Sequence, residues 1–326
     1  MHYKVSVIVP VHNVAPYIEL CANSLFNQTL EELQCVFVND HTEDYSMEIL
    51  ERLLDAYPNR RPHTVFLTLE EERGIPAARK AGQAQAQGEF FAHCDSDDYV
   101  DPDMYETLYN AAIAEQADIV ECEFWEGFEG FSRHRHHKEI GSKNYVVEYL
   151  KGKIWAYVWP RIVHSSLCGK VDFSTCNYLE DWYMSVQLMH HARRVAVVRQ
   201  PLYHYCLNWT SVTHMTSPDN FESQFNECKE NYRLMHDYVV RNLGLGEEAF
   251  LLKKVKIKAR SLPLLASTGN RLWRRVYLDT FPEVNWHLLF SLDVPKERKT
   301  EFLAVVMGVY PLMDRLRRVY RTLIKA

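Results

Sequence analysis

The chain has 326 residues, enough for one large domain or two ordinary ones. Apolar residues make up 47% and charged residues 25%, which is typical of a soluble globular protein. No uncharged apolar run is long enough to span a membrane, and Met1 to Lys4 leads directly into a strand-like pattern, so we predict neither a membrane span nor a signal peptide. The 8 cysteines are scattered without a C-x-x-C pair, which favours reduced thiols in the cytosol over a disulfide framework or a cysteine zinc site.

Charge is distributed unevenly along the chain. The formal net charge is -6, yet residues 251–326 carry 16 Lys or Arg against 6 Asp or Glu. An acidic body with a basic C-terminal region predicts a surface that meets an anionic partner, either membrane phospholipid or nucleic acid. We disfavour nucleic acid because the body is acidic and carries no recognition motif.

The first hundred residues alternate apolar strands with helices. Continuous apolar runs predict buried strands over residues 5–11, 33–38 and 64–69, and a fourth along residues 90–92. This alternation predicts a parallel, doubly wound α/β sheet, which binds ligands at the carboxyl ends of its strands. No G-x-G-x-x-G follows the first strand and no G-x-x-x-x-G-K-[ST] occurs anywhere, which disfavours the common dinucleotide and P-loop sites.

Carboxylates follow two of these predicted strands. Asp40 comes after the second, and Asp95, Asp97 and Asp98 come after the fourth. Because the three clustered aspartates repel one another, we expect a hard divalent cation with oxygen ligands, which would suit a nucleotide diphosphate. For an isolated D-x-D pattern, a solvated acidic turn before a helix is the simpler interpretation.

The middle of the chain is less regular. A helix is predicted over residues 104–116, strands over 118–124 and 195–198, and a polar loop over 127–141. The loop contains a run of basic residues, Arg133, His134, Arg135, His136 and His137. A histidine cluster suggests a metal site, but the flanking arginines argue against one and favour a mobile basic loop.

From about residue 218 the apolar periodicity is helical. One long helix carries Phe221 to Met235, and a second is predicted over residues 247–266. Residues 300–326 combine an apolar face with a basic face, near Trp273 and Trp286. Such a helix lies in a membrane interface or packs on the rest of the chain, and both interpretations stay open.

Six short motifs occur in a fixed order on the predicted elements. They are VSVIVPVHN at 5–13, VNDHTED at 38–44, GIPAAR at 74–79, DSDDY at 95–99, ED at 180–181, and YHY at 203–205 with SVT at 211–213. This set resembles the family 2 glycosyltransferases, inverting enzymes of the GT-A fold that use nucleotide-sugar donors. The resemblance covers roughly residues 4–215 and leaves the last hundred residues without a clear counterpart.

The resemblance implies a GT-A type, doubly wound and mostly parallel sheet, followed by a C-terminal α-helical extension. It implies a donor half at residues 1–103, an acceptor half at 104–215, and a helical, basic region at 216–326. The implied enzyme is cytoplasmic and metal-dependent. It would move a hexose from a nucleotide-sugar, a UDP-sugar, to a hydroxyl of a glycan or lipid-linked saccharide in surface polysaccharide biosynthesis. The basic helices would then contact the inner face of the cell membrane.

Residue roles follow from the same resemblance. The implied donor-binding residues are Pro10, Val11, Asn13, Asp40, Arg79, Asp95 and Ser96. Asp40 would bind uracil or its ribose, Asp95 would face the ribose, and Arg79 would contact the diphosphate or simply lie on a helix surface. Asp97 would ligate Mn²⁺ or Mg²⁺, which neutralises the diphosphate leaving group.

Inversion requires a base that deprotonates the acceptor hydroxyl. Asp181 is the first candidate and Glu180 the second, although either could be a helix-start carboxylate stabilised by the helix dipole. His204 would contact the diphosphate or pack among tyrosines. The tryptophans Trp155, Trp159 and Trp182 would stack on an acceptor sugar or belong to the aromatic core.

Two departures from the family pattern lie near the implied donor site. His41 replaces the usual Gly after Asp40, and Lys80 replaces the usual Asn after Arg79, so the identity of the donor is in question. The alternative function is a catalytically silent, glycosyltransferase-like binding or scaffold protein. Such a protein would be expected to lack the D-x-D pattern or the base, and both are present in this sequence.

Overall fold

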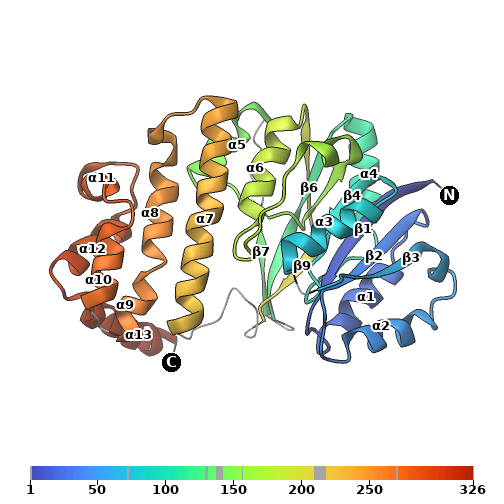
Figure 1. Cartoon of the computed structure of the whole chain (residues 1–326), viewed down its shortest axis with the longest axis horizontal. Helices are drawn as coiled ribbons and strands as arrows, with labels where there is room; N and C mark the ends of the chain where they lie inside the picture. The colour runs from blue at the N-terminus through green and yellow to red at the C-terminus, as the bar shows by residue number, and fades with distance from the viewer. Residues whose placement is uncertain are drawn as a thin grey trace. The chain divides into compact units, whose positions relative to one another are not determined.

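The computed structural model describes residues 2–71, 73–128, 131–136, 142–155, 157–208, 218–268 and 271–325. The chain forms two compact units (Figure 1). The first consists of Met1–Val146 and Ile154–His214, and the second of Val147–Lys153 and Met215–Ala326.

The first unit is built on one mixed sheet. Its strands are β1 (Tyr3–Val11), β2 (Leu33–Asn39), β3 (Thr64–Thr68), β4 (Gly88–His93), β5 (Tyr99–Val100), β6 (Ile119–Phe128), β7 (Phe131–Arg135), β8 (Arg161–His164) and β9 (Val195–Cys206). Within the described residues their order is β3-β2-β1-β4-β8-β6-β9-β5, with β7 paired to β6. Strands β1 to β4 are parallel, whereas β8 is antiparallel to both β4 and β6. The predicted mostly parallel α/β sheet is confirmed.

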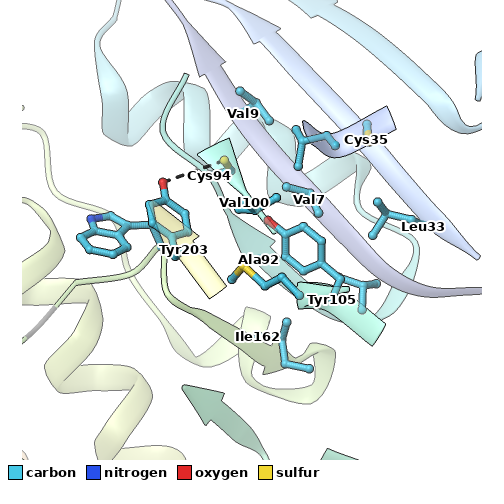
Figure 2. Packing of buried hydrophobic residues seen from close by; sticks show 14 of the residues in the cluster. Val7, Val9, Leu33, Cys35, Ala92, Cys94, Val100, Tyr105, Ile162 and Tyr203 are labelled. Atoms are coloured by element: carbon cyan, nitrogen blue, oxygen red, sulfur yellow. Dashed lines mark hydrogen bonds between the residues drawn. The ribbon is translucent and has the colours of Figure 1, made fainter. Parts of the chain in front are cut away.

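Helices cover both faces of the parallel half. They are α1 (Ile18–Phe26), α2 (Ser46–Leu54), α3 (Ile75–Gln85) and α4 (Met104–Glu115). One layer packs Val7 and Val9 of β1 and Cys35 of β2 together with Tyr105 of α4 (Figure 2). On the other face, α3 approaches so closely that a side chain at Gly82 would overlap Ile8. Burial on both faces explains why these strands read as continuous apolar runs.

Pro10 lies inside β1. The residue is in register with Val38 of β2. The pairing of β1 with β4 ends at Ile8 and His93, so the proline stands beyond the last pair on that side. A residue without an N–H group is therefore tolerated in this central strand.

The predicted loop over residues 127–141 is wrong for its described part. β6 extends to Phe128 and returns as β7, with Trp125 opposite His134 and Phe124 opposite Arg135. The basic residues conceal the alternation that a strand normally displays, because both of its faces carry polar side chains. The strand predicted over 195–198 also continues, as β9, to Cys206.

The second unit is helical. Its helices are α7 (Pro218–Leu243), α8 (Leu251–Ala259), α9 (Leu262–Thr268), α10 (Arg271–Asp279), α11 (Val284–Phe290), α12 (Lys296–Val306) and α13 (Tyr310–Lys325). The seven-residue segment 147–153, at the end of α5 (Ser142–Leu150), groups with them. The long helix expected from about residue 218 is confirmed.

Two helices predicted in the second unit are each divided. The helix expected over 247–266 is interrupted between α8 and α9, since Pro263 cannot donate an interior helix hydrogen bond. The segment 300–326 is interrupted at Gly308, whose φ of 75° places it in the left-handed region. None of the described helices is long and apolar enough to cross a membrane.

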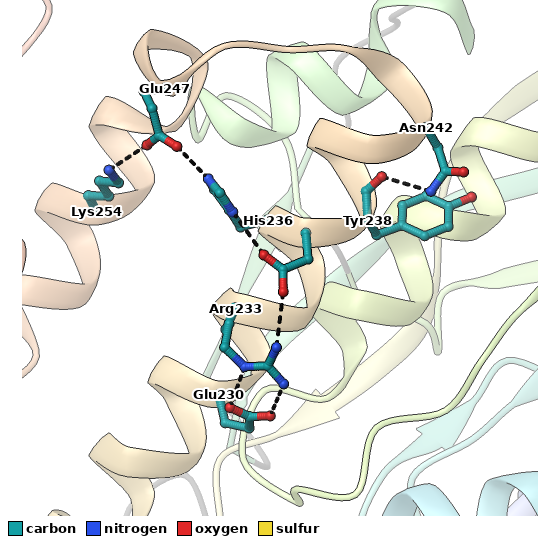
Figure 3. Close-up of polar contacts among 8 residues, drawn as sticks. Glu230, Arg233, His236, Tyr238, Asn242, Glu247 and Lys254 are labelled. Carbon is teal, nitrogen blue, oxygen red and sulfur yellow. Dashed lines mark hydrogen bonds and ion pairs between the residues drawn. The ribbon is translucent and has the colours of Figure 1, made fainter.

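A chain of ion pairs links α7 to α8 within the second unit (Figure 3). Arg233 pairs with Glu230 and Asp237, and His236 Nε2 lies 2.7 Å from Glu247 Oε1. Glu247 in turn pairs with Lys254, at 2.7 Å. The network lies along the helix surfaces, where ion pairs orient side chains but add little to the free energy of folding.

Candidate active site

The loops that follow β1 and β2 contact each other and carry the first donor-side candidates. Val11 is fully buried in β1, and Pro10 is half-buried beside it. His12 Nδ1 lies 2.7 Å from the carbonyl oxygen of Asp40, and the side-chain oxygen of Asn13 accepts the N–H of Glu43 at 2.8 Å. These contacts hold the ends of the two strands together.

Asp40 anchors the loop in front of α3. It is 4% exposed, and its two carboxylate oxygens accept the backbone N–H groups of Arg73 and Gly74 at 2.8 and 2.7 Å. Gly74 has a φ of 82°, and a side chain there would overlap the amide of Asn177. The G-x-x-x-A-R motif therefore begins with glycine because the backbone needs this conformation and this close approach.

His41, the departure from the family pattern, also has a left-handed backbone, with φ at 53°. Glycine adopts this conformation without a steric cost, which explains the residue usual at this position. The His41 ring compensates in part, because its Nε2 lies 2.8 Å from the carbonyl oxygen of Leu69. Lys80, the second departure, is exposed on α3.

The acidic turn after β4 contains three aspartates with different surroundings. Asp98 is 1% exposed, and its two oxygens accept the hydroxyl of Tyr203 and the N–H of Cys206, both at 2.7 Å. Burial, followed by the charges of Asp97 and Asp95, raises the pKa of Asp98 well above its usual value. Asp98 thus fastens the turn to β9.

Asp97 is half-buried and has fewer protein contacts. Its Oδ2 accepts the side-chain amide of Asn208 at 3.3 Å, and Asn208 is in turn held by the hydroxyl of Tyr17 at 2.9 Å. Burial, with a smaller contribution from the charge of Asp95, raises the pKa of Asp97 to about 6. Carboxylates crowded in this way fit a hard divalent cation, which takes oxygen ligands and relieves the repulsion.

Arg79 joins the acidic turn to the second half of the unit. It projects from α3, is 3% exposed, and pairs with Asp95 at 2.7 Å and with Glu180. It is therefore not an ordinary helix-surface arginine. Asp95 and Glu180 therefore contact the same guanidinium group, although 85 positions separate them in the sequence.

Asp181 follows Glu180 and begins α6 (Asp181–His191). Its side chain is half-buried, whereas Glu180 is 8% exposed. A carboxylate in the first turn of a helix is stabilised by the helix dipole, which favours its ionised form. The pairing of Arg79 with Glu180 brings this helix start to the acidic turn.

His204 has partners other than a phosphate. Its Nε2 lies 2.8 Å from Asp101 Oδ1, and its ring stacks on Tyr99 with centroids 4.2 Å apart. Ser96 is 8% exposed within the turn. The SVT segment at 211–213 lies outside the described residues.

Sequence reasoning missed Tyr203 and Asn208 as parts of the site. The hydroxyl of Tyr203 donates to Asp98 and accepts the N–H of Asp95 at 3.2 Å, so it holds the turn at two points. The Y-x-Y motif was noticed, but its partner could not be found from sequence because β9 reaches the turn only in the folded sheet. Asn208 carried no sequence signal.

Aromatic rings form a stacked group beside this turn. Tyr157 and Trp159 stack with centroids 4.8 Å apart, and Trp159 stacks on Tyr205 at 5.5 Å. Trp159 is 4% exposed, whereas Trp155, Tyr157 and Tyr205 are half-buried. Trp182 is 8% exposed. Trp159 and Trp182 therefore belong to the buried core, and Trp155, Tyr157 and Tyr205 pack against it at its margin.

The fold and the order of these motifs define a GT-A type glycosyltransferase domain. The family model described as glycosyl transferase family 2 matches residues 6–172, about half of the chain. The chain therefore belongs to glycosyl transferase family 2, as the motif resemblance predicted.

Individual relatives agree with this family. EpsH of Bacillus subtilis (strain 168), named as a glycosyltransferase, is 29% identical over 230 residues, which are 67% of this chain and 65% of EpsH. The match thus spans slightly less than two thirds of this relative's length.

Solved structures share the fold over more of the chain. S. aureus TarS has a TM-score of 0.64 at 17% identity and covers 94% of this chain and 54% of TarS. TarS 1–349 in complex with UDP-GlcNAc has a TM-score of 0.56 at 18% identity, covering 98% and 92%. Mannosyltransferase PcManGT from Pyrobaculum calidifontis, in complex with GDP-Man and Mn²⁺, has a TM-score of 0.52 at 14% identity, covering 97% and 88%. The last hundred residues, which lacked a sequence counterpart, therefore have a structural one.

Proposed function

We propose that the protein is an inverting glycosyltransferase that moves a sugar from a UDP-sugar to a hydroxyl of a glycan or lipid-linked saccharide in surface polysaccharide biosynthesis. One observation carries the proposal: Arg79 joins Asp95 of the acidic turn to Glu180, the neighbour of the proposed base. A donor site and a base that belong to one reaction must lie together in this way. The UDP-GlcNAc bound by TarS supports a UDP-sugar donor.

In this proposal, residues 1–103 bind the donor. Asp40 shapes the nucleoside pocket by holding the loop at Gly74, and its remaining lone pairs accept hydrogen bonds from uracil. Pro10, Val11 and Asn13 form the adjacent wall. Asp95 and Ser96 face the ribose, and Arg79 adds positive charge near the diphosphate.

Asp97 holds the divalent cation in this proposal, either Mn²⁺ or Mg²⁺. Its half-buried carboxylate fits such an ion, and the Mn²⁺ in PcManGT supports this assignment. When bound, the cation neutralises charge on the departing diphosphate. Asn208 orients Asp97, and Tyr203 with Asp98 keeps the turn in place.

Asp181 acts as the base. Inversion needs a carboxylate that is ionised and near the donor turn, and the first turn of α6 favours ionisation. Glu180 is less suited, because it is 8% exposed and its carboxylate is already engaged by Arg79. The half-buried rings of Trp155, Tyr157 and Tyr205, in the acceptor half at 104–215, offer stacking faces for a saccharide acceptor.

The C-terminal region, residues 216–326, is proposed to bring the enzyme to the inner face of the cell membrane from the cytoplasm. On α13 the side chains of Leu312, Leu316, Val319 and Tyr320 are 53–65% exposed. Their spacing places them along one side of the helix, with Arg315 and Arg318 beside them. An exposed apolar stripe with basic neighbours matches an anionic lipid surface.

The donor assignment is tested by calorimetric titration of UDP with and without Mn²⁺. We expect Mn²⁺ to strengthen UDP binding to the native chain and to have no such effect on Asp97→Ala. Glu43→Ala, at an exposed carboxylate near the same sheet edge, is the control and should bind as the native chain does. Undiminished Mn²⁺-dependent binding by Asp97→Ala would contradict the metal assignment.

A further inference from the structure

Two histidines and a glutamate lie close together beside the paired strands β6 and β7. Since Trp125 lies opposite His134 in the antiparallel register, Glu123 and Trp125 share a face with His134 and His136. Glu123 belongs to a central strand and is 2% exposed, whereas His134 belongs to the edge strand β7 and His136 follows directly after its end.

The arginines that flank these histidines in sequence lie on the opposite face. Arg135 sits over the ring of Trp155, 5.2 Å from its centroid, and 3.5 Å from Glu126. Arg133 lies opposite Glu126 in the register and is exposed. The period of two in a strand thus separates imidazoles from guanidinium groups, and the sequence-based objection to a metal does not apply.

The candidate ligand atoms of Glu123, His134 and His136 lie close together in this structure. Glu123 Oε2 lies 2.7 Å from His134 Nε2 and 3.2 Å from His136 Nδ1, and one ligand atom from each residue lies within 4.8 Å of the others. His134 Nε2 is buried and makes no hydrogen bond within the described part of the chain, despite the short distance to the carboxylate. Ligand atoms around a tetrahedral Zn²⁺ are roughly 3.3 Å apart, given bonds of about 2.0–2.1 Å.

We propose that Glu123, His134 and His136 bind a Zn²⁺ ion that joins β7 to β6. Two imidazoles and a carboxylate suit a borderline transition-metal ion, whereas the all-oxygen turn at Asp97 suits a hard cation. The ion would satisfy His134 Nε2 and place positive charge against the buried carboxylate. By fixing β7, it would also hold Arg135 over Trp155.

The first experiment measures metal binding and not sugar transfer, so it is independent of the proposed function. The untagged full chain is stripped with chelator, and zinc binding is followed by equilibrium dialysis with elemental analysis. We expect one Zn²⁺ per chain, retained in Asp97→Ala and bound at least tenfold more weakly in His134→Ala/His136→Ala. The matched control removes another histidine pair, His190→Ala/His191→Ala, and should bind as the native chain does.

A second measurement identifies the ligands directly. Co²⁺ in place of Zn²⁺ should give the intense visible absorption of a four-coordinate ion, and Glu123→Gln should change that spectrum. Heating the metal-free variants by themselves shows whether the substitutions unfold the chain. Zinc affinity unchanged in the double variant, or lost equally in the His190 and His191 control, would overturn the proposal.

Discussion

The two units differ in the partners that surround some of their buried charged groups. In the first, the buried charges near the strand ends include carboxylates, among them Asp40 and Asp98, each held by N–H or O–H donors. In the second they include lysines: Lys258 is fully buried and donates to the carbonyl oxygens of Leu278 and Thr280, at 3.0 and 2.7 Å. Burial lowers the pKa of Lys258 to about 8.

The difference lies in whether the protein itself supplies all the partners of the buried group. Backbone carbonyl oxygens accept hydrogen bonds from the Lys258 ammonium group, although burial still disfavours its charged form. At the acidic turn, Asp98 is satisfied by β9, while Asp97 keeps oxygen lone pairs that a cation can use. In the second unit, basic and apolar side chains of α13 remain exposed.

The largest expected effect concerns the proposed base in the first unit. Asp181→Asn keeps the size of the side chain but removes its ability to accept a proton, so the transfer rate should fall by about 10²–10⁴-fold. The affinity for UDP in calorimetry should stay within about twofold. A fully active Asp181→Asn variant would remove this residue as the base and return attention to Glu180.

Gly74→Ala tests whether the loop in front of α3, which Asp40 anchors, requires glycine at this position. The backbone conformation favours glycine and the added methyl group would overlap Asn177, so we expect a loss of roughly 2–3 kcal/mol in unfolding free energy. Gly244→Ala in the second unit is the control. Its φ is 63° but no atom lies within 4 Å of the added carbon, so only about 1 kcal/mol should be lost. Denaturant titration measures both, and equal losses would show that the contact with Asn177 is unimportant.

Leu316→Ser tests whether the exposed apolar side chains of α13 contact lipid. Removing one inserted leucine should weaken binding to vesicles of anionic phospholipid by about 2 kcal/mol, roughly 30-fold. Leu20→Ser changes a leucine of similar exposure in the first unit and should leave vesicle binding unchanged. Co-sedimentation measures both variants. If Leu316→Ser binds vesicles as well as the native chain does, α13 serves a packing role instead.

The smallest effect is a pH dependence. Because the pKa of Asp97 is raised to about 6, its protonated form is favoured in the metal-free fold, and the stability gained from that proton is lost as pH rises through about 6. A cation competes with this proton. Mn²⁺ affinity should therefore fall about tenfold for each pH unit below about 6, as measured by titration calorimetry. A flat profile between pH 5 and 7 would show that Asp97 does not titrate with the metal.

Prediction from the sequence worked best where the chain is buried on both faces. The four parallel strands and the helices between them could be located because continuous apolar runs and helical stripes report burial directly. It failed at β7, where both faces are polar, and at α8 and α9, where one proline divides a continuous helical pattern. Within the candidate site, the turn at Asp95–Asp98 and the pair at Glu180–Asp181 were identified, and Tyr203 and Asn208 were not linked to the turn.

The sequence by itself determined the family, the parallel half of the sheet and the candidate site residues, because these depend on local pattern and motif order. Only the tertiary structure decided which partners those residues contact. In the structure, Asp98 accepts hydrogen bonds from β9, and Arg79 pairs with both Asp95 and Glu180. The basic residues of β7 alternate between the two faces of the strand. Contacts between residues a hundred positions apart depend on strand order and register, and neither can be inferred from the local sequence.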